Sequence, residues 1–390
     1  ARELPIFHTA DVVVVGGGPA GFGAAVAASR AGAKVALIER YGSLGGLFTN
    51  GMVLIIIGTG VKENGQFKLV TRGVCEEFMR RLEAMGEGAI TKLEPNIGQP
   101  TADPEAAKVL MDEMVQEAKV DVFFHAWGVD VIQNGQSVQG VVFESKQGRQ
   151  AVLAKVVVDA SGDGDVFFQA GESYTQISHA LGFVHRLGNT DRIDKSKAPE
   201  NTRLNIGGRE PLKSVRWVNS LGNRGNGLDI RDMTQAEMMH RKSAWNYTQR
   251  IRKTPGYEEV YLAQTTSQLG VRATRLLNGV VRIDKKGAVE RATYPDTVAV
   301  SGHDGLRLPE FQIPYGSLLP KSVDNVLVAG RCISCAPDLI DRVRLIPVCV
   351  VTGQAAGVAA ALAAKGGVRP RDLPAADIQK VLREQGAYLG

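Results

Sequence analysis

The sequence predicts an α/β fold, a doubly wound parallel sheet with a second, mixed α+β domain inserted into its chain. Three observations predict it. The run Val12 to Val15 has the composition of a buried strand and Ala24 to Ala28 that of a helix, with a glycine-rich turn between them. The buried run Val156 to Val158 also leads into glycines, and a third run ends at Gly330. Because the carboxyl ends of parallel strands meet at one edge of a sheet, the three turns are expected to form one crevice.

The first turn contains Gly16, Gly18 and Gly21, and each glycine is expected to have a different structural role. Gly16 permits a tight turn, Gly18 lets the backbone approach a pyrophosphate, and Gly21 lets the new helix pack closely on the sheet. The helix directs its free N–H groups and its positive dipole end at the phosphates. The following strand ends at Glu39, whose carboxylate can accept hydrogen bonds from ribose hydroxyls. This order of elements predicts a dinucleotide site.

The chain after Glu39 does not continue the strand–helix alternation of a nicotinamide-type dehydrogenase domain. A glycine-bearing loop covers residues 41–51, and a helix is expected from Pro104 to Lys119. Two strands follow, and Asn134-Gly135 predicts a hairpin turn in the second of them. An Ala-rich helix near the C-terminus is expected to have its amino end near Thr352 to Gln354.

The polar, Arg-rich stretch from about Glu172 to Pro309 separates the second glycine turn from the third. Its alternating segments predict a mixed or antiparallel sheet with helices, and its place in the chain predicts that it covers the crevice. We therefore expect three parts: residues 1–170 as the first part of the nucleotide-binding domain, 171–314 as a substrate or cap domain, and 315–390 as the C-terminal part of the nucleotide-binding domain.

Composition and charge are those of an ordinary globular enzyme. The chain has 390 residues, of which 44% are hydrophobic and 22% charged. Its 46 basic and 41 acidic residues give a net charge of +5, but they are dispersed, so nucleic acid is not expected as a partner. No apolar stretch is expected to reach the ~20 residues of a membrane helix, and the first ten residues lack a signal-peptide core. Four cysteines do not make a disulfide framework, so a cytoplasmic location is expected, without a metal site.

Three segments carry a resemblance to a known family. They are GGGPAG at 16–21 with Glu39, DASGDGD at 159–165, and VLVAGRCIS followed by RLIPVCVVTGQAAG at 326–357. With them the chain resembles the FAD-dependent oxidoreductases of the glutathione-reductase-type flavoprotein superfamily over nearly its whole length. The resemblance implies a Rossmann-like FAD-binding domain. Its first turn would hold the pyrophosphate, its acid the adenosine ribose, and its last helix would point its N-terminus at the isoalloxazine.

The resemblance also implies which residues bind FAD. They are Gly16, Gly18, Pro19, Ala20, Gly21, Glu39, Arg40, Gly45, Gly46, Leu47, Thr49, Gly128, Ala160, Gly162, Asp163, Gly330, Arg331, Gly353 and Gln354. Two positions depart from the family's pattern. The second site more usually has the sequence DATGDGD, and here Ser161 replaces the threonine and keeps a hydroxyl group. The third site commonly has Gly-Asp, and here it has Gly330-Arg331. Arg331 is therefore expected either to contact the diphosphate or to face solvent.

Cys332 and Cys335 form a CxxC pair directly after the third strand. Beside a flavin such a pair could pass electrons as a dithiol. The favoured interpretation is that both are small buried apolar residues, because Pro337 argues against the regular helix start that would lower a thiol pKa.

His179 and His185 flank an apolar stretch that predicts a strand over the flavin. Each is a candidate catalytic acid or base, with a core or surface histidine as the alternative. Among the arginines, Arg344 lies just before Pro347 and is the candidate to bind an acidic substrate or to stabilise reduced flavin. Arg342 would lie on the opposite side if the segment is extended.

Arg272 and Arg275 have the spacing of neighbours on one helix face, and one of them could also hold a substrate carboxylate.

The leading functional hypothesis is an FAD-dependent dehydrogenase or reductase that moves a hydride between flavin N5 and a small, anionic organic substrate. A nicotinamide-dependent dehydrogenase would not need the second and third glycine sites. A flavin monooxygenase would gain support from a second GxGxxG, which is absent. A flavoprotein that uses FAD without net redox, as an isomerase, a lyase or an electron-transfer subunit, stays open.

Overall fold

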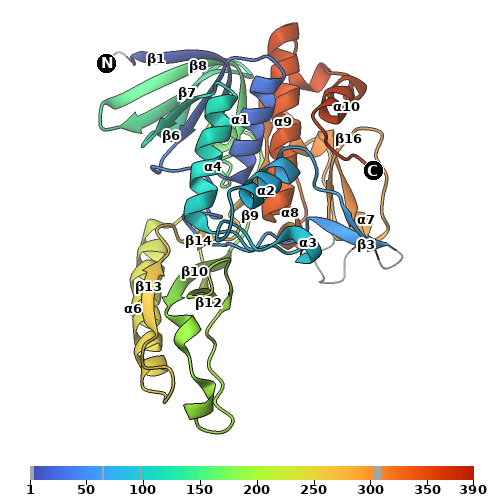
Figure 1. The fold of residues 1–390 in the computed structure, drawn as a ribbon. Helices are drawn as coiled ribbons and strands as arrows, with labels where there is room; N and C mark the ends of the chain where they lie inside the picture. Colours follow the sequence, from blue (N-terminus) through green and yellow to red (C-terminus); the bar gives the residue numbers. More distant parts are fainter. Residues whose placement is uncertain (1–3, 64–65, 97, 303–308) are drawn as a thin grey trace.

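The protein is described by a computed structural model that covers residues 4–63, 66–96, 98–302 and 309–390. Its centre is a seven-stranded sheet with the order β5-β2-β1-β8-β7-β6, in which β18 also pairs with β8 (Figure 1). The strands are β1 (Ile6–Val15), β2 (Val35–Glu39), β5 (Asp121–Phe124), β6 (Trp127–Asn134), β7 (Ser137–Ser145), β8 (Gly148–Asp159) and β18 (Val326–Val328). All neighbours in β5-β2-β1-β8-β18 are parallel. The predicted α/β fold is therefore confirmed.

The ends of three strands meet at one edge of this sheet. Asp159, the last residue of β8, is in register with Val15 of β1 on one side and with Val328 of β18 on the other. The glycine turns after β1, β8 and β18 therefore lie side by side although more than 300 residues of chain separate the first from the last. The hairpin predicted at Asn134-Gly135 is also present, between the antiparallel strands β6 and β7.

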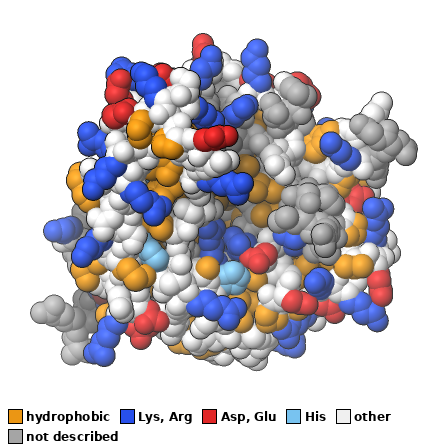
Figure 2. All heavy atoms as spheres, turned by 90° about the horizontal axis from the view of Figure 1, so that it is seen from below, with side chains coloured by type: hydrophobic (Ala, Val, Ile, Leu, Met, Phe, Trp, Pro, Cys, Tyr) orange, Lys and Arg blue, Asp and Glu red, His pale blue; other side chains and the backbone are white. Residues whose placement is uncertain are grey.

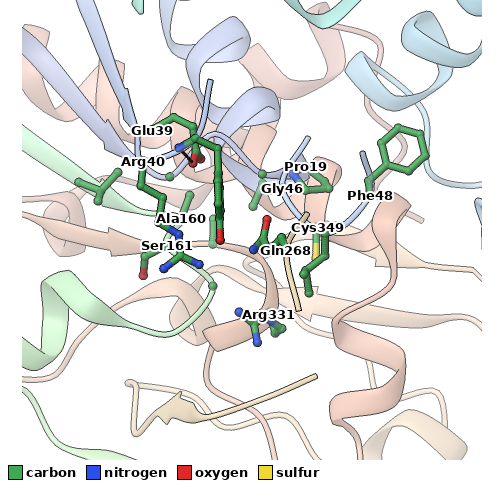
Figure 3. A pocket seen from close by; sticks show the side chains of 18 of the residues that line it. Pro19, Glu39, Arg40, Gly46, Phe48, Ala160, Ser161, Gln268, Arg331 and Cys349 are labelled. Carbon is green, nitrogen blue, oxygen red and sulfur yellow. Dashed lines mark hydrogen bonds between the residues drawn. The ribbon is translucent and has the colours of Figure 1, made fainter. Parts of the chain in front are cut away.

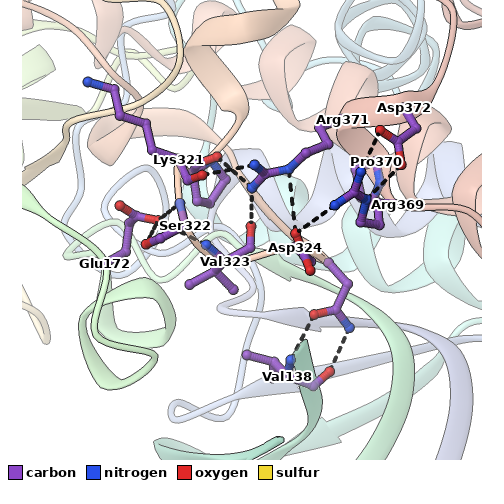
Figure 4. Close-up of polar contacts among 12 residues, drawn as sticks. Val138, Glu172, Lys321, Ser322, Val323, Asp324, Arg369, Pro370, Arg371 and Asp372 are labelled. Atoms are coloured by element: carbon purple, nitrogen blue, oxygen red, sulfur yellow. Dashed lines mark hydrogen bonds and ion pairs between the residues drawn. The ribbon is translucent and has the colours of Figure 1, made fainter. Parts of the chain in front are cut away.

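Side chains outside the sheet hold β18 in place (Figure 4). Asn325 exchanges two hydrogen bonds with the backbone of Val138 in β7, at 2.8 and 2.6 Å. The Glu172 carboxylate accepts hydrogen bonds from the N–H and the hydroxyl of Ser322, and Arg371 donates to the carbonyl of Lys321. These contacts tie the chain before β18 to three distant parts of the sequence, which fixes the third glycine turn beside the other two.

Helices α1 (Pro19–Arg30) and α9 (Ile346–Gly366) pack against each other beside the sheet (Figure 1). The prediction for the start of α9 is wrong by about six residues, because Pro347 is tolerated in a first helical turn. The 21 residues of α9 are also long and apolar enough to cross a membrane, contrary to the expectation from sequence. Since 89% of its most apolar 18-residue segment is buried inside the protein, α9 serves here as a core helix.

Among the described residues, this part of the protein has three more helices longer than five residues. They are α2 (Val74–Ala84), α4 (Pro104–Glu117) and α10 (Ala375–Glu384). Helix α4 confirms the helix predicted from Pro104. Its N-cap is Asp103, whose side chain accepts the N–H groups of Glu105 and Ala106.

The inserted region forms an antiparallel sheet that projects away from the larger one (Figure 1). Its strands are β10 (His179–Gly188), β11 (Gly208–Arg209), β12 (Val215–Gly225), β13 (Tyr261–Thr265) and β14 (Gly270–Val271). Helix α6 (Ile230–Arg252) packs against this sheet. The domain boundaries near residues 170 and 315 stay a prediction.

Three further strand pairs complete the described structure: β9 (Tyr174–Gln176) with β15 (Arg275–Leu277), β16 (Thr297–Ser301) with β17 (Phe311–Pro314), and β3 (Gly60–Glu63) with β4 (Gln66–Leu69). Arg275 is therefore a strand residue, and Arg272 lies between β14 and β15. The helix suggested by their spacing is wrong, because the neighbouring backbone pairs with β10 and β9 instead.

Candidate active site

A cavity opens at the carboxyl edge of the large sheet (Figure 3). It is lined by residues at or just after the ends of four parallel strands, Val15, Glu39, Ala160 and Ala329. We call it the strand-edge cavity. The N-terminus of α1, at Pro19, also lines it, so that the positive end of a helix dipole faces the interior.

The glycine turn after β1 has the geometry that a diphosphate needs. A Cβ atom built on Gly18 meets nothing within 4 Å, since Gly18 borders the cavity. Gly18 is also the N-cap of α1 and makes no side-chain hydrogen bond, which leaves the first N–H groups of the helix to a ligand. Gly16 has φ +95°, and a Cβ on Gly21 would overlap the carbonyl oxygen of Gly16. The residues present therefore fit a bound diphosphate.

Glu39 lies at one end of the cavity and is buried. Its Oε2 accepts the N–H of Gly17 at 2.6 Å, and its Oε1 accepts the N–H of Tyr41 at 2.8 Å. Burial raises the pKa of Glu39, and these two backbone hydrogen bonds oppose the rise. The guanidinium of Arg40 lies 5.0 Å from the Tyr41 ring centre and 5.6 Å from that of Trp127. This end offers carboxylate lone pairs and aromatic faces.

Arg331 lies in the wall of the cavity below Ser161 (Figure 3). Its Nη2 is 2.9 Å from Oδ1 of Asp163, and its Nη1 donates to the carbonyl of Val271. The expectation that Arg331 might instead face solvent is wrong, because this ion pair turns it inward. The nearby Asp165 also lines the cavity. Burial, together with the charges of neighbouring aspartates, raises the pKa of Asp165 to about 6.

Twelve of the residues predicted to bind the cofactor line this cavity. They are Gly16, Gly18, Pro19, Ala20, Glu39, Arg40, Gly46, Leu47, Gly128, Ala160, Gly162 and Arg331.

The other seven, Gly21, Gly45, Thr49, Asp163, Gly330, Gly353 and Gln354, are outside the lining, and their contacts explain why. Gly353 packs against the backbone of α1, where a Cβ would overlap the carbonyl oxygen of Ala20. Gln354 accepts the N–H of Val74 at 3.1 Å, and the Thr49 hydroxyl donates to the carbonyl of Leu44 at 2.6 Å.

The remaining four of these seven also have structural roles. Gly21 packs on Gly16, the Gly45 N–H donates to the carbonyl of Gly17, and a Cβ on Gly330 would come within 2.7 Å of Ala20 Cβ. Asp163 is engaged by Arg331.

The cavity also has lining residues that sequence reasoning missed, above all Gln268 and Cys349 (Figure 3). Gln268 belongs to the loop between β13 and β14, in the inserted region. Its Oε1 is buried and has no hydrogen-bond partner among the described residues. A buried acceptor without a partner is costly, so this atom suits a donor on a bound molecule. No pattern around Gln268 in the sequence indicates this role.

A second cleft adjoins the first cavity. The two share four lining residues, Val53, Arg272, Arg344 and Ile346. We call it the inner cleft. Seen from below, Lys and Arg side chains and a histidine gather near the middle of this face of the molecule (Figure 2).

His179 and Arg344, two of the predicted catalytic residues, both line the inner cleft. The N–H of Ala180 donates to Nδ1 of His179 at 2.7 Å, so neutral His179 carries its proton on Nε2. That Nε2 is 3.4 Å from Oδ1 of Asp341. Burial lowers the pKa of His179, Arg344 and other arginines lower it further, and Asp341 opposes them. Arg342 also lines the cleft, because α8 (Ile340–Val343) is helical and the segment is not extended, so its predicted placement is wrong.

The structure rules out His185 as a residue of either cavity. It lies in β10, is fully buried, and lines neither space. Strand alternation places it on the same face as Phe183 and Leu187, which belong to hydrophobic clusters that include residues of α6. Within the described residues, neither of its ring nitrogens has a hydrogen-bond partner. His185 is a core residue, and its prediction as catalytic is wrong.

We expect His185 to make the protein acid-sensitive. Burial lowers its pKa from 6.5 to about 4, so the folded protein resists a proton that the unfolded chain accepts. The free energy of unfolding is therefore undiminished by His185 above pH 6.5. It falls by up to about 3 kcal/mol as the pH is lowered from 6.5 to 4, because the unfolded chain binds a proton there that the folded protein does not. Urea unfolding of His185→Phe between pH 7 and 4.5 should show a flatter pH dependence of stability than the wild type. Parallel curves for wild type and His185→Phe would contradict this.

Cys332 and Cys335 line neither cavity, and both are buried and free. Burial raises the pKa of the Cys335 thiol to about 12 and that of Cys332 well above its usual value. Thiols of this kind are poor nucleophiles at neutral pH, so the interpretation as small buried residues is the better one.

Comparisons with known proteins bear on the family. A family model described as FAD dependent oxidoreductase matches residues 11–179 and 182–382. A 49-residue segment is 53% identical to dihydrolipoyl dehydrogenase of Trypanosoma brucei brucei, but it covers only 13% of this chain and 10% of that protein.

Solved structures similar to this one have names that give different reactions. A geranylgeranyl bacteriochlorophyll reductase-like protein from Thermoplasma acidophilum is 15% identical, with a TM-score of 0.48, and 97% of this chain and 84% of that chain are covered. The p-nitrophenol 4-monooxygenase from Pseudomonas putida is 12% identical, with a TM-score of 0.46 and the same coverage. These likenesses are too low to assign a reaction. The family match, over most of the chain, shows that the protein belongs to the FAD-dependent oxidoreductase family and that FAD is its cofactor.

Proposed function

We propose that the protein is a dehydrogenase or reductase that moves a hydride between N5 of FAD and a small organic substrate in the inner cleft. The observation that carries this proposal is the wall shared by the two cavities, formed by Val53, Arg272, Arg344 and Ile346. A molecule in the inner cleft would lie against the same residues as one end of a molecule in the strand-edge cavity. Ile346 is the first residue of α9, whose N-terminus the resemblance directs at the isoalloxazine.

Bound FAD supplies a hydride acceptor or donor at N5. On the substrate, one C–H bond breaks or forms with the two electrons of the hydride, and one proton leaves or joins the neighbouring atom. His179 holds a proton on Nε2 in the inner cleft, so it is suited to exchange that proton with the substrate. Val53, Trp217 and Ile346 give the cleft apolar walls that suit the carbon skeleton of a substrate.

Several finer assignments belong to the same proposal. Membership of the glutathione-reductase-type superfamily is supported by the three glycine turns at the ends of three parallel strands. A reducing compartment such as the cytoplasm is supported by four cysteines that are free and buried. The dispersed charges of the sequence argue against nucleic acid as a partner, and the burial of α9 argues against a membrane span. A small anionic substrate is supported by the basic side chains that line the inner cleft.

The test is the reactivity of the flavin in the purified protein. We expect the absorbance of oxidised flavin, and we expect it to bleach anaerobically with a small organic substrate or, after chemical reduction, to return when an oxidised organic substrate is added. His179→Gln should keep its flavin but slow this step by about 10²-fold or more and remove a pH dependence from its rate. A flavin that reacts only with a nicotinamide nucleotide and then inserts oxygen from O₂ into the substrate would establish a monooxygenase and contradict the proposal.

A further inference from the structure

The inner cleft contains more basic than acidic side chains. Its lining includes Arg272, Arg342, Arg344 and Lys285, against Asp338 and Asp341. An excess of like charge in a concave, partly apolar space raises the local potential and favours an anion. The question is which of these cations is available to bind one.

Arg344, the residue that the sequence favours, is already engaged. Its Nε and Nη2 donate to the same oxygen, Oδ1 of Asp341, at 2.9 and 2.6 Å. Asp341 also faces Nε2 of His179 at 3.4 Å. The positive charge of Arg344 is therefore largely compensated by a neighbouring carboxylate, and a substrate anion would have to compete with Asp341.

Arg272 differs from the ion-paired arginines around it. No carboxylate lies within ion-pair distance of its guanidinium among the described residues, whereas Arg331 pairs with Asp163 and Arg275 with Asp165. Of its five N–H donors, one is used, in a hydrogen bond from Nη2 to Oδ1 of Asn219 at 3.1 Å. Burial and the charge of Arg344 lower the pKa of Arg272 to about 10, with a smaller contribution from Arg331, and the charge of Asp341 opposes them only in part.

The structure also makes room for this guanidinium. It lies over Gly182 of β10, where a Cβ would come within 2.9 Å of Nη2. Arg272 lines both the strand-edge cavity and the inner cleft, so its side chain is at the junction where substrate and flavin would meet. Trp217 of β12 and Ile346 of α9 provide apolar surface in the same cleft.

We propose that Arg272 is the substrate-anchoring residue and that it binds the carboxylate of an organic acid in the inner cleft. The planar fork of a guanidinium matches the two oxygens of a carboxylate, and the apolar walls suit its carbon skeleton. The inference rests on the proposed function and deepens it, because it names the class of substrate. It replaces Arg344 by Arg272 as the anion-binding residue.

The test is equilibrium binding to the oxidised, FAD-loaded protein, which needs no turnover and therefore stands apart from the test of the proposed function. Acetate, succinate and benzoate are titrated while the flavin spectrum and the binding heat are followed, with benzamide as the neutral counterpart of benzoate. We expect at least one carboxylate to bind, and benzoate to bind about tenfold or more tightly than benzamide.

In Arg272→Met the affinity for that carboxylate should fall about tenfold or more while FAD content is unchanged, and Arg272→Lys should recover only part of it. Arg231→Met, on the exposed start of α6, is the matched control and should bind as the wild type does.

Three results would overturn the inference. They are the absence of binding by all three carboxylates, an Arg272→Met variant that binds the carboxylates as tightly as the wild type does, and an Arg272-dependent site that takes inorganic phosphate in preference to the carboxylates. The second would remove Arg272 from the carboxylate site, and the third would assign it to a phosphorylated ligand.

Discussion

Replacing Gly18 by valine is expected to abolish FAD binding and to leave the protein folded. Gly18 has φ −67° and ψ −175°, an extended conformation that valine adopts without strain. A Cβ on Gly18 would meet no protein atom within 4 Å, so the substitution causes no clash in the protein itself. The valine methyl groups would instead occupy the space that the diphosphate needs beside the N-terminus of α1. We expect FAD affinity to fall more than about 10²-fold.

The flavin-to-protein ratio after gel filtration, followed by titration of the apoprotein with FAD, measures this effect. Gly18→Ala, with a single methyl group, should lose less affinity than Gly18→Val. Circular dichroism of both variants should match that of the wild-type apoprotein. Stoichiometric FAD in purified Gly18→Val would show that the diphosphate does not lie beside this turn.

Replacing Gly353 by alanine is expected to destabilise the fold itself. Gly353 lies in α9, and a Cβ there would overlap the carbonyl oxygen of Ala20 in α1. Gly357, one turn later, stands in the same relation to Ala24. Because the clash is with backbone, relief requires the two core helices to separate. We expect a loss of about 3 kcal/mol or more in the free energy of unfolding, or a failure to fold.

The matched control is Gly366→Ala in the same helix. A Cβ on Gly366 comes no closer than 3.5 Å to another atom, the methyl Cγ2 of Val368. Alanine is a better helix former than glycine by about 1 kcal/mol, so Gly366→Ala should be neutral or stabilising. Urea denaturation of the two variants, followed by circular dichroism, should show a large loss of stability in Gly353→Ala and no loss in Gly366→Ala. Equal stability of Gly353→Ala and wild type would mean that α1 and α9 are not in the close contact described here.

The sequence by itself determined the elements whose pattern is local. A run of β-branched residues, a glycine turn and an apolar helix are neighbours in the chain from Val12 to Ala28, and their order predicted a strand, a phosphate-binding turn and a helix. Equivalent patterns at Val156 to Val158 and before Gly330 predicted that the three turns share one sheet edge. Local patterns succeed here because the backbone conformation of a strand, a turn or a helix depends mainly on adjacent residues.

Only the tertiary structure decided what the side chains between these patterns contact. Gly353 resembles a cofactor glycine in sequence, yet α1, more than 300 residues away, determines its role. Strand alternation in β10 turns His185 into the core, and Asp341 compensates Arg344 while Arg272 has no carboxylate partner among the described residues. Burial and charge compensation depend on groups that approach from distant parts of the chain. The spacing of residues along the sequence therefore does not determine them.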